Sequence, residues 1–282
     1  MSSAIKKLQR LCIILFIFTA TACAEEYKCI ISLAPSITES LYELGLEQSI
    51  KGITIYCPKG AIKKEIIGAL LEPDIEKIIL LNPDLIIATK EGNSKAIVEK
   101  LKRLKFDVYV VESPENFNEI CENYYRLAEK LDRTKEAIKI INTANDSLQE
   151  IYDRLKNFDK LKLFWEIGIK PLYTAGNKSF VNDYNYYSKT INVYKNINAR
   201  YLSVDIEDVI ERNPDIILLV NTGYFNSQEP KNWKKYKTIN AVKNNKVFMI
   251  NSNNIFATTP LTFANGVKII TQAIYGDIFN DK

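Results

Sequence analysis

A fourteen-residue segment occurs twice along this chain, once in each half, and this repeat restricts the possible fold more than any other feature. Residues 74–87 (DIEKIILLNPDLII) and 205–218 (DIEDVIERNPDIIL) are identical at eight of fourteen positions. In each copy an Asp is placed to cap a short helix, Asn-Pro-Asp ends it, and an apolar run typical of a buried strand follows. We therefore expect two similar α/β lobes, with a cleft between them in which a ligand can bind.

The remaining sequence alternates short apolar runs with helical patterns, as βαβ units do. Ser36 and Glu39 match a capping box at the start of the first predicted helix, residues 35–44. Between the halves, residues 134–156 contain no Gly or Pro. At 1.5 Å per residue this helix would span roughly 35 Å, about the width of a small domain. Strands are predicted at residues 29–33, 53–56, 85–88, 108–111, 161–164, 216–220 and 247–250.

These patterns predict an α/β fold of two Rossmann-like lobes, each with a parallel central sheet, joined by a single long helix. We place the N-terminal lobe at residues 23–117 and the C-terminal lobe at residues 158–282. Residues 118–157 form the helical connection, which includes the long helix.

The first 22 residues have the features of a signal peptide. A basic start precedes an apolar run at residues 11–18 that is too short to span a bilayer. Two processing sites fit. Residues 20–22 (ATA) before Cys23 resemble a loose lipobox, after which Cys23 would carry the lipid anchor, whereas residues 22–24 (ACA) suit ordinary cleavage. With either site, the protein is expected in the periplasm or cell envelope.

Composition excludes several classes of function. The 282-residue chain contains no His, which removes Ser-His-Asp and Cys-His nucleophiles and the usual His-based zinc sites. CxxC, GxGxxG, P-loop and GxSxG motifs are also absent from the sequence. We therefore expect no enzyme, no protein-bound metal and no cofactor. Glu166 with Asp183 is the one carboxylate pair that could be nominated for hydrolysis.

The charge pattern does not favour a nucleic-acid partner. Lys6, Lys7 and Arg10 lie in the first ten residues, so removing that segment lowers the formal net charge from +4 to +1. Nucleic-acid binders usually concentrate basic side chains on one face, and the sequence shows no such cluster.

Several motifs together resemble the cobalamin and iron-chelate receptor family of ABC importers. They are residues 30–39 (IISLAPSITE), residues 52–58 (GITIYCP), residues 171–176 (PLYTAG) and the two Asn-Pro-Asp units. The match covers the mature chain in order. The resemblance implies a monomeric solute-binding protein that captures a corrinoid or ferric chelate and delivers it to a membrane permease and its ATPase.

The resemblance also implies roles for individual residues. One glutamate at the tip of each lobe docks onto the permease in that family, and Glu76 and Glu207 match those positions. Acidic residues in the first turn of a helix also stabilise it by ~0.3–1 kcal/mol, which is the alternative explanation. Ligand contacts are expected from six side chains, which would otherwise pack in the cores: Tyr56, Leu70, Trp165, Tyr173, Tyr201 and Phe256.

The late loop before the last predicted helix points to the type of cargo. Siderophore-binding relatives often carry arginine there, whereas residues 257–260 (ATTP) have no positive charge. This favours a corrinoid or another weakly charged complex. Two alternatives stay open: a haem receptor, with Tyr184, Tyr186 and Tyr187 as candidate axial ligands, and a surface lipoprotein that binds a host macromolecule.

Overall fold

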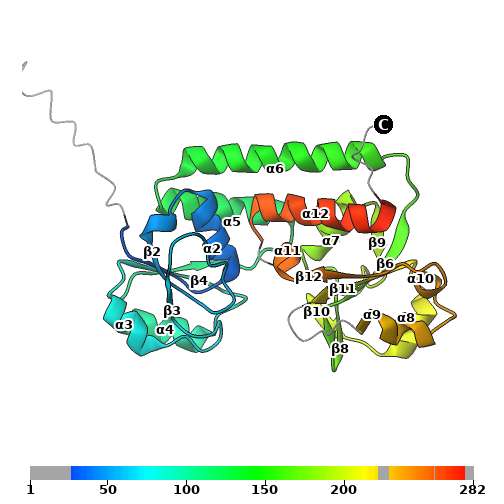
Figure 1. Ribbon diagram of the computed structural model, residues 1–282, viewed down its shortest axis with the longest axis horizontal. Helices are drawn as coiled ribbons and strands as arrows, with labels where there is room; N and C mark the ends of the chain where they lie inside the picture. Colours follow the sequence, from blue (N-terminus) through cyan, green and yellow to red (C-terminus); the bar gives the residue numbers. More distant parts are fainter. Residues whose placement is uncertain (1–26, 222–228, 257, 277–282) are drawn as a thin grey trace, which may run out of the picture.

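Two α/β lobes lie side by side beneath a layer of long helices in the computed structural model (Figure 1). The structure describes residues 27–221, 229–256 and 258–276. The predicted signal peptide and Cys23 fall outside these ranges. Among the described residues, no helix combines the length and apolar character needed to cross a membrane.

The N-terminal lobe is built on a five-stranded parallel sheet of order β3-β2-β1-β4-β5. Its central strands are buried because helices cover both faces, which explains their continuous apolar sequences. The strands are β1 (Ile30–Ser32), β2 (Ile50–Ile53), β3 (Glu65–Ile66), β4 (Leu85–Thr89) and β5 (Val108–Val111), and the helices are α2 (Pro35–Glu43), α3 (Ile75–Leu81) and α4 (Lys95–Arg103).

The capping box predicted for the first helix is wrong. The N-cap residue of α2 is Ala34, without a side-chain cap, and Pro35 occupies the first turn. Proline suits this position because its fixed φ matches the helix and it has no amide hydrogen to satisfy. Ser36 therefore lies inside the helix rather than before it.

The C-terminal lobe contains the predicted parallel sheet, of order β12-β11-β6-β9, and a small antiparallel sheet, β10-β8-β7, that the sequence did not indicate. The strands are β6 (Leu161–Glu166), β7 (Gly168–Ile169), β8 (Leu172–Ala175), β9 (Thr190–Asn192), β10 (Tyr201–Ser203), β11 (Ile216–Asn221) and β12 (Val247–Asn251). The helices are α7 (Val181–Tyr187), α8 (Ile206–Arg212), α9 (Glu229–Asn232), α10 (Asn240–Lys243), α11 (Asn253–Phe256) and α12 (Pro260–Tyr275).

The repeated segment forms α3 with β4 in one lobe and α8 with β11 in the other. Both helices end at an Asn in the left-handed conformation, Asn82 with φ 44° and Asn213 with φ 46°, a backbone state that Asn tolerates better than most residues. The predicted Asp cap forms in the first copy, where the Asp74 side chain accepts from the amide of Lys77. Asp205 in the second copy makes no such bond.

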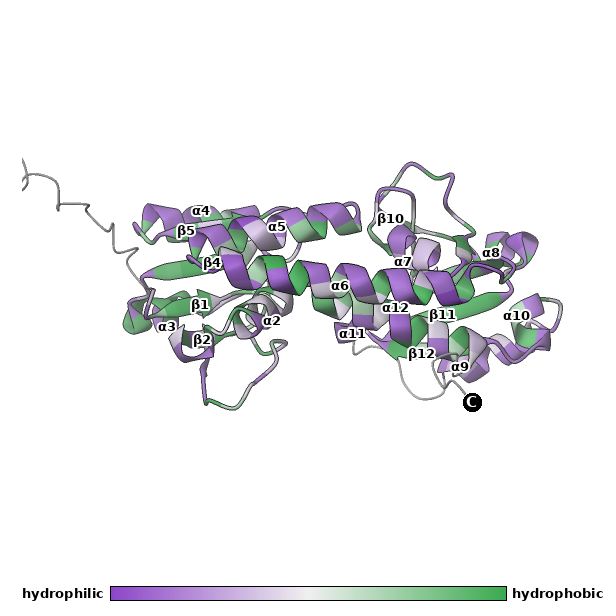
Figure 2. Ribbon diagram, turned by 90° about the horizontal axis from the view of Figure 1, so that it is seen from above, coloured by the Kyte–Doolittle hydropathy of each residue, from purple (hydrophilic) through white to green (hydrophobic). Residues whose placement is uncertain are grey.

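Two helices join the lobes, α5 (Phe117–Lys130) and α6 (Thr134–Leu155), and Asp132 breaks the path between them with φ 55°. The last helix, α12, lies against α6 and α5 (Figure 1). Seen from above, the hydrophobic strands lie inside and the polar faces of the helices lie outside (Figure 2). The two-lobe α/β fold predicted from the repeat is confirmed.

One hydrogen bond links the first helix of the N-terminal lobe with the start of the last helix. Thr259, the N-cap residue of α12, donates from Oγ1 to Oε1 of Glu43 at 2.6 Å. Thr259 is fully buried and Glu43 is half-buried at the end of α2. The contact therefore joins two elements from opposite ends of the described chain.

Candidate functional site

A cavity of about 610 Å³ lies between the two lobes. On one side it is lined by residues that follow β2, β4 and β5 together with the start of α2, and on the other by residues that follow β6 and β12. Four residues of α5 also line the cavity: Ile120, Asn123, Tyr124 and Leu127. Ligands of open α/β sheets bind at the carboxyl ends of parallel strands, and here two such ends face the same space.

The N-terminal wall is held in shape by Asn93, which is buried. Its amide nitrogen donates to the carbonyl oxygens of Leu70 at 2.8 Å and Leu33 at 3.2 Å, and its amide oxygen accepts from the Thr89 amide at 2.8 Å. The loop after β1, the loop that contains Leu70 and the end of β4 are therefore tied to one side chain. Leu70 and Tyr56, two of the residues expected to contact a ligand, line the cavity, and Tyr56 has 55% of its surface exposed.

Aromatic side chains form much of the C-terminal wall. Tyr201 and Phe256, both expected to face a ligand, line the cavity and meet edge to face with ring centroids 6.5 Å apart. Phe180 contacts Phe256 in the same manner at 6.2 Å. Such rings can pack on a planar macrocycle or chelate. Burial, followed by the nearby Glu91 carboxylate, raises the pKa of the Tyr201 phenol well above its ordinary value, so the phenol stays neutral.

Only two of the described residues that line the cavity are charged, and both are acidic: Glu91 and Glu112. Glu112 pairs with Lys90 at 2.7 Å at the exposed rim. Arg200 lies 3.5 Å from Glu91 and donates to the carbonyl oxygens of Pro114 at 2.9 Å and Ser113 at 3.4 Å. Arg200 thus connects the C-terminal lobe to the loop that follows β5.

Two of the six side chains expected to contact a ligand do not line this cavity. Trp165 lies in the core of the C-terminal lobe with no exposed surface, and its indole nitrogen donates to Asn185 at 3.2 Å. It lies within β6, and its side chain packs in the core of the lobe rather than in the cleft. Tyr173 is 41% exposed but lies on β8 in the small antiparallel sheet, outside the cavity lining. The expectation that these two side chains face the cavity is wrong.

The tyrosine cluster that was considered for haem lies away from the cavity. Tyr184 is fully buried and donates to the carbonyl oxygen of Ile255 at 3.1 Å. Tyr186 is exposed and stacks on Tyr152 with ring centroids 5.1 Å apart. Helix packing therefore explains these residues, although Tyr184 packs in the core and not at the surface.

The nominated pair of carboxylates does not form a shared site. Glu166 is buried and accepts from the Trp233 indole nitrogen at 2.6 Å. Asp183 accepts from the Phe117 amide at 2.6 Å, at the start of α5. Neither lines the cavity. Among the described residues, no group of three or more Cys, Asp or Glu is placed to hold a metal ion.

Glu76 and Glu207 occupy equivalent exposed positions in the first turns of α3 and α8. Within the described chain, neither carboxylate forms a salt bridge. Both helices lie at the ends of their lobes away from α6 (Figure 1). The two acidic groups are thus presented at the side of the molecule opposite the long helix.

Four important residues were not predicted from the sequence: Phe180, Glu91, Asn93 and Arg200. Glu91 and Asn93 directly follow a strand that was recognised as buried and parallel, so the rule for carboxyl ends of strands would have drawn attention to them. Phe180 and Arg200 lie in irregular segments beside the unforeseen antiparallel sheet. No sequence signal places them at the cavity.

Comparison with known proteins gives a consistent result. The family model for periplasmic binding proteins matches residues 30–253. The vitamin B12-binding protein of Vibrio parahaemolyticus is 28% identical over 251 residues, which cover 88% of this chain and 90% of the relative. An uncharacterised ABC transporter substrate-binding lipoprotein of Bacillus subtilis is 28% identical over 271 residues, which cover 91% of this chain and 83% of the relative.

A solved structure shows the same fold. A possible iron-binding, periplasmic solute-binding protein from Staphylococcus epidermidis superimposes with a TM-score of 0.78 and 28% identity. The match covers 89% of this chain and 100% of that one.

Proposed function

Because this chain belongs to the periplasmic binding protein family, we propose that its interlobe cavity captures a corrinoid, or another weakly charged metal chelate, for delivery to an ABC permease and its ATPase. The observation that carries the proposal is the cavity itself. It joins the carboxyl ends of two parallel sheets, presents aromatic faces, and has no cationic side chain among its described lining residues.

The choice of cargo rests on chemistry and on the relatives. Anionic siderophores and the propionates of haem are usually bound by Arg or Lys. The described lining offers instead Tyr56, Tyr201, Phe180 and Phe256 for packing and two carboxylates. Residues 222–228 and 257, which lie outside the described part, contain no charged residue in the sequence. A vitamin B12-binding relative that aligns over most of this chain supports a corrinoid in particular.

A binding titration tests this function. The mature protein is titrated by calorimetry with cyanocobalamin, cobinamide, haemin and two ferric siderophores, because both Trp165 and Trp233 are buried away from the cavity and report ligand only indirectly. We expect saturable, one-to-one binding of the corrinoids. Tight binding of haemin or a siderophore alone would contradict the proposed cargo, and silence across the panel would contradict small-chelate capture.

Matched variants locate the site. Removing an aromatic side chain from the cavity is expected to weaken binding by about tenfold or more, since a buried ring contact contributes roughly 1–2 kcal/mol. Tyr201→Ala and Phe256→Ala serve this purpose. Tyr186→Ala is the control, because Tyr186 is an exposed aromatic on α7 outside the cavity. Equal losses in all three variants would argue against the cavity as the site.

Two further features belong to this proposal. Glu76 and Glu207 dock the two lobes onto the permease, supported by their equivalent exposed positions in the repeat. Cys23 carries a lipid anchor, supported by the lipobox-like sequence before it and by the lipoprotein relative in Bacillus subtilis. Loss of metabolic labelling by a radioactive fatty acid in Cys23→Ser tests the anchor, and unchanged labelling contradicts it.

A further inference from the structure

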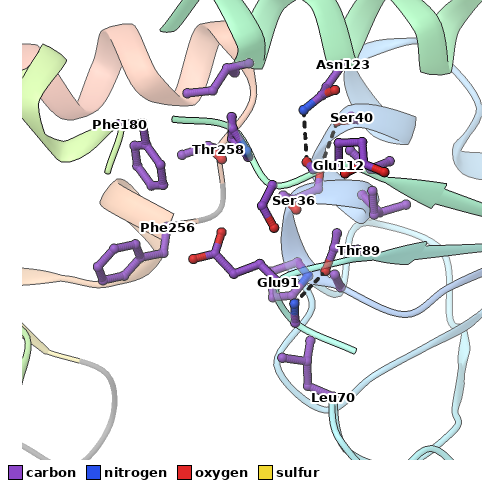
Figure 3. Close-up of a pocket in the computed structure, with 18 of the residues that line it drawn as sticks. Ser36, Ser40, Leu70, Thr89, Glu91, Glu112, Asn123, Phe180, Phe256 and Thr258 are labelled. Atoms are coloured by element: carbon purple, nitrogen blue, oxygen red, sulfur yellow. Dashed lines mark hydrogen bonds between the residues drawn. The ribbon is translucent and has the colours of Figure 1, made fainter. Parts of the chain in front are cut away.

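One carboxylate extends into the open space of the cavity. Glu91 lies in the loop after β4, and its side chain reaches from the N-terminal wall toward the aromatic wall formed by Phe180 and Phe256 (Figure 3). The adjacent Gly92 amide donates to Thr89 Oγ1 at 3.1 Å, which holds the loop against the end of the strand. Glu91 is therefore presented to any molecule that enters between the lobes.

Two cations lie near this carboxylate, and one of them, Arg200, pairs with it at the long distance of 3.5 Å. The Arg200 guanidinium makes its shorter contacts with the carbonyl oxygens of Pro114 and Ser113, at 2.9 and 3.4 Å, and its approach to Glu91 is 3.5 Å. Lys90 pairs with Glu112 at the exposed rim, and neither Arg200 nor Lys90 lines the cavity. The neighbouring Tyr201 phenol is neutral. Among the described residues that line the cavity, a bound ligand would thus meet two carboxylates and no cationic side chain, with the charge of Glu91 partly balanced by Arg200 behind it.

We propose that Glu91 sets the charge preference of the cavity, so that cationic and neutral metal complexes bind in preference to anionic ones of the same shape. This inference rests on the proposed function of the cavity and extends it to the class of ligand. Opposite unit charges several ångströms apart at the edge of a protein attract by enough to change an affinity about three- to tenfold. Arg200 opposes this effect by partly neutralising Glu91.

Three corrinoids of nearly identical shape make the test specific. Aquacobalamin under slightly acidic conditions carries a positive charge, cyanocobalamin is neutral, and the monocarboxylic acid made by hydrolysing one side-chain amide of cyanocobalamin is negative. For the wild-type protein we expect affinity to decrease in that order. In Glu91→Gln the ratio of the anion's Kd to the cation's Kd should fall about three- to tenfold.

Two variants at Arg200 separate charge from shape. Arg200→Met should move the ratio in the opposite direction to Glu91→Gln, whereas Arg200→Lys keeps the charge and should keep the ratio within about twofold. Glu99→Gln is the control. This substitution removes the same charge from an exposed position on α4, outside the cavity.

The outcomes distinguish this inference from the proposed function. A wild-type protein that binds all three corrinoids but whose ratio is unchanged in Glu91→Gln, or changes equally in Glu99→Gln, overturns the role of Glu91 and leaves corrinoid capture intact. A wild-type preference for the anion also overturns it. A protein that binds none of the three corrinoids overturns the proposed cargo, and this inference with it.

Discussion

Asp84 and Asp215 occupy the same position of the repeated segment, and each accepts hydrogen bonds from backbone amides at the start of the first strand of its own lobe. Asp84 Oδ2 accepts from the backbone amides of Lys28 at 2.7 Å and Cys29 at 3.0 Å, directly before β1. Asp215 Oδ2 accepts from the amide of Lys162 in β6 at 2.9 Å. The last residue of each Asn-Pro-Asp unit therefore helps to hold the strand that follows it beside the first strand of the lobe, independently of any role in ligand binding.

This arrangement makes the two aspartates equivalent in stability experiments. Asp84→Ala and Asp215→Ala should each lower the free energy of unfolding by about 1–2 kcal/mol, because backbone amides lose a charged acceptor. Urea denaturation measures the change. Asp146→Ala, an exposed position on α6, is the control and should change stability by less than about 0.5 kcal/mol. A loss in only one lobe would contradict the equivalence.

Two buried carboxyls predict an unusual pH dependence. Burial raises the pKa of Glu43 and of Glu166 from an ordinary value of 4.5 to about 7. The folded state therefore holds protons that the unfolded state has released, so stability is highest below pH 4.5 for these groups and falls as pH rises toward 7. The decrease should be roughly 1–3 kcal/mol for each group.

Amide variants isolate the two contributions. Glu43→Gln and Glu166→Gln keep an acceptor for Thr259 and for the Trp233 indole but cannot titrate. Each should flatten part of the pH profile of unfolding free energy between mildly acidic and neutral conditions, and Glu99→Gln should leave it as it is. Profiles of the two variants that run parallel to the wild-type profile over this range would show that neither carboxyl has a raised pKa in the fold.

Permease docking can be separated from ligand binding. The double variant Glu76→Ala, Glu207→Ala should bind cargo with unchanged affinity, because both carboxylates lie outside the cavity. Its stimulation of ATP hydrolysis by the reconstituted transporter should fall at least about tenfold, since losing a desolvated charge partner costs about 2–5 kcal/mol. Full stimulation by the double variant would leave helix stabilisation as the role of these residues.

The cavity wall depends on one amide side chain. Asn93→Ala should lower the free energy of unfolding by about 2 kcal/mol, since its three backbone partners lie in buried or partly buried positions. It should also weaken cargo binding at temperatures at which the variant is fully folded, because Leu70 and the Thr89 loop lose their tie. Asn142→Ala, exposed on α6, is the control. Unchanged affinity in a destabilised Asn93 variant would restrict its role to folding.

Local signals in the sequence were sufficient for the overall architecture. The Asn-Pro-Asp units and the long run without Gly or Pro are properties of neighbouring residues, so the paired lobes, the parallel sheets and α6 follow from them. The small antiparallel sheet was missed because β7 and β10 have two and three residues and show no periodicity. Tyr173, which the resemblance places at the cleft, lies on β8 in this sheet.

The site was only partly predictable, for a physical reason. Tyr56, Leu70, Tyr201 and Phe256 were placed at the cavity by resemblance, but no pattern distinguishes an aromatic that faces a cleft from one that faces a core. Trp165 shows this, since its strand is buried on both sides. Arg200 was missed because its partners at Ser113 and Pro114 are remote in sequence and belong to the other lobe.

The bond between Thr259 and Glu43 spans 216 residues of chain. Contacts of such long sequence separation form late in folding, because the entropy of closing the intervening loop must be overcome first. All strands of the three sheets precede Thr259, so each sheet can assemble before α12 has been synthesised. The final helix then packs against α5 and α6, and a chain that ends before residue 259 would hold two lobes joined by these two helices but without the bond from Thr259 to Glu43.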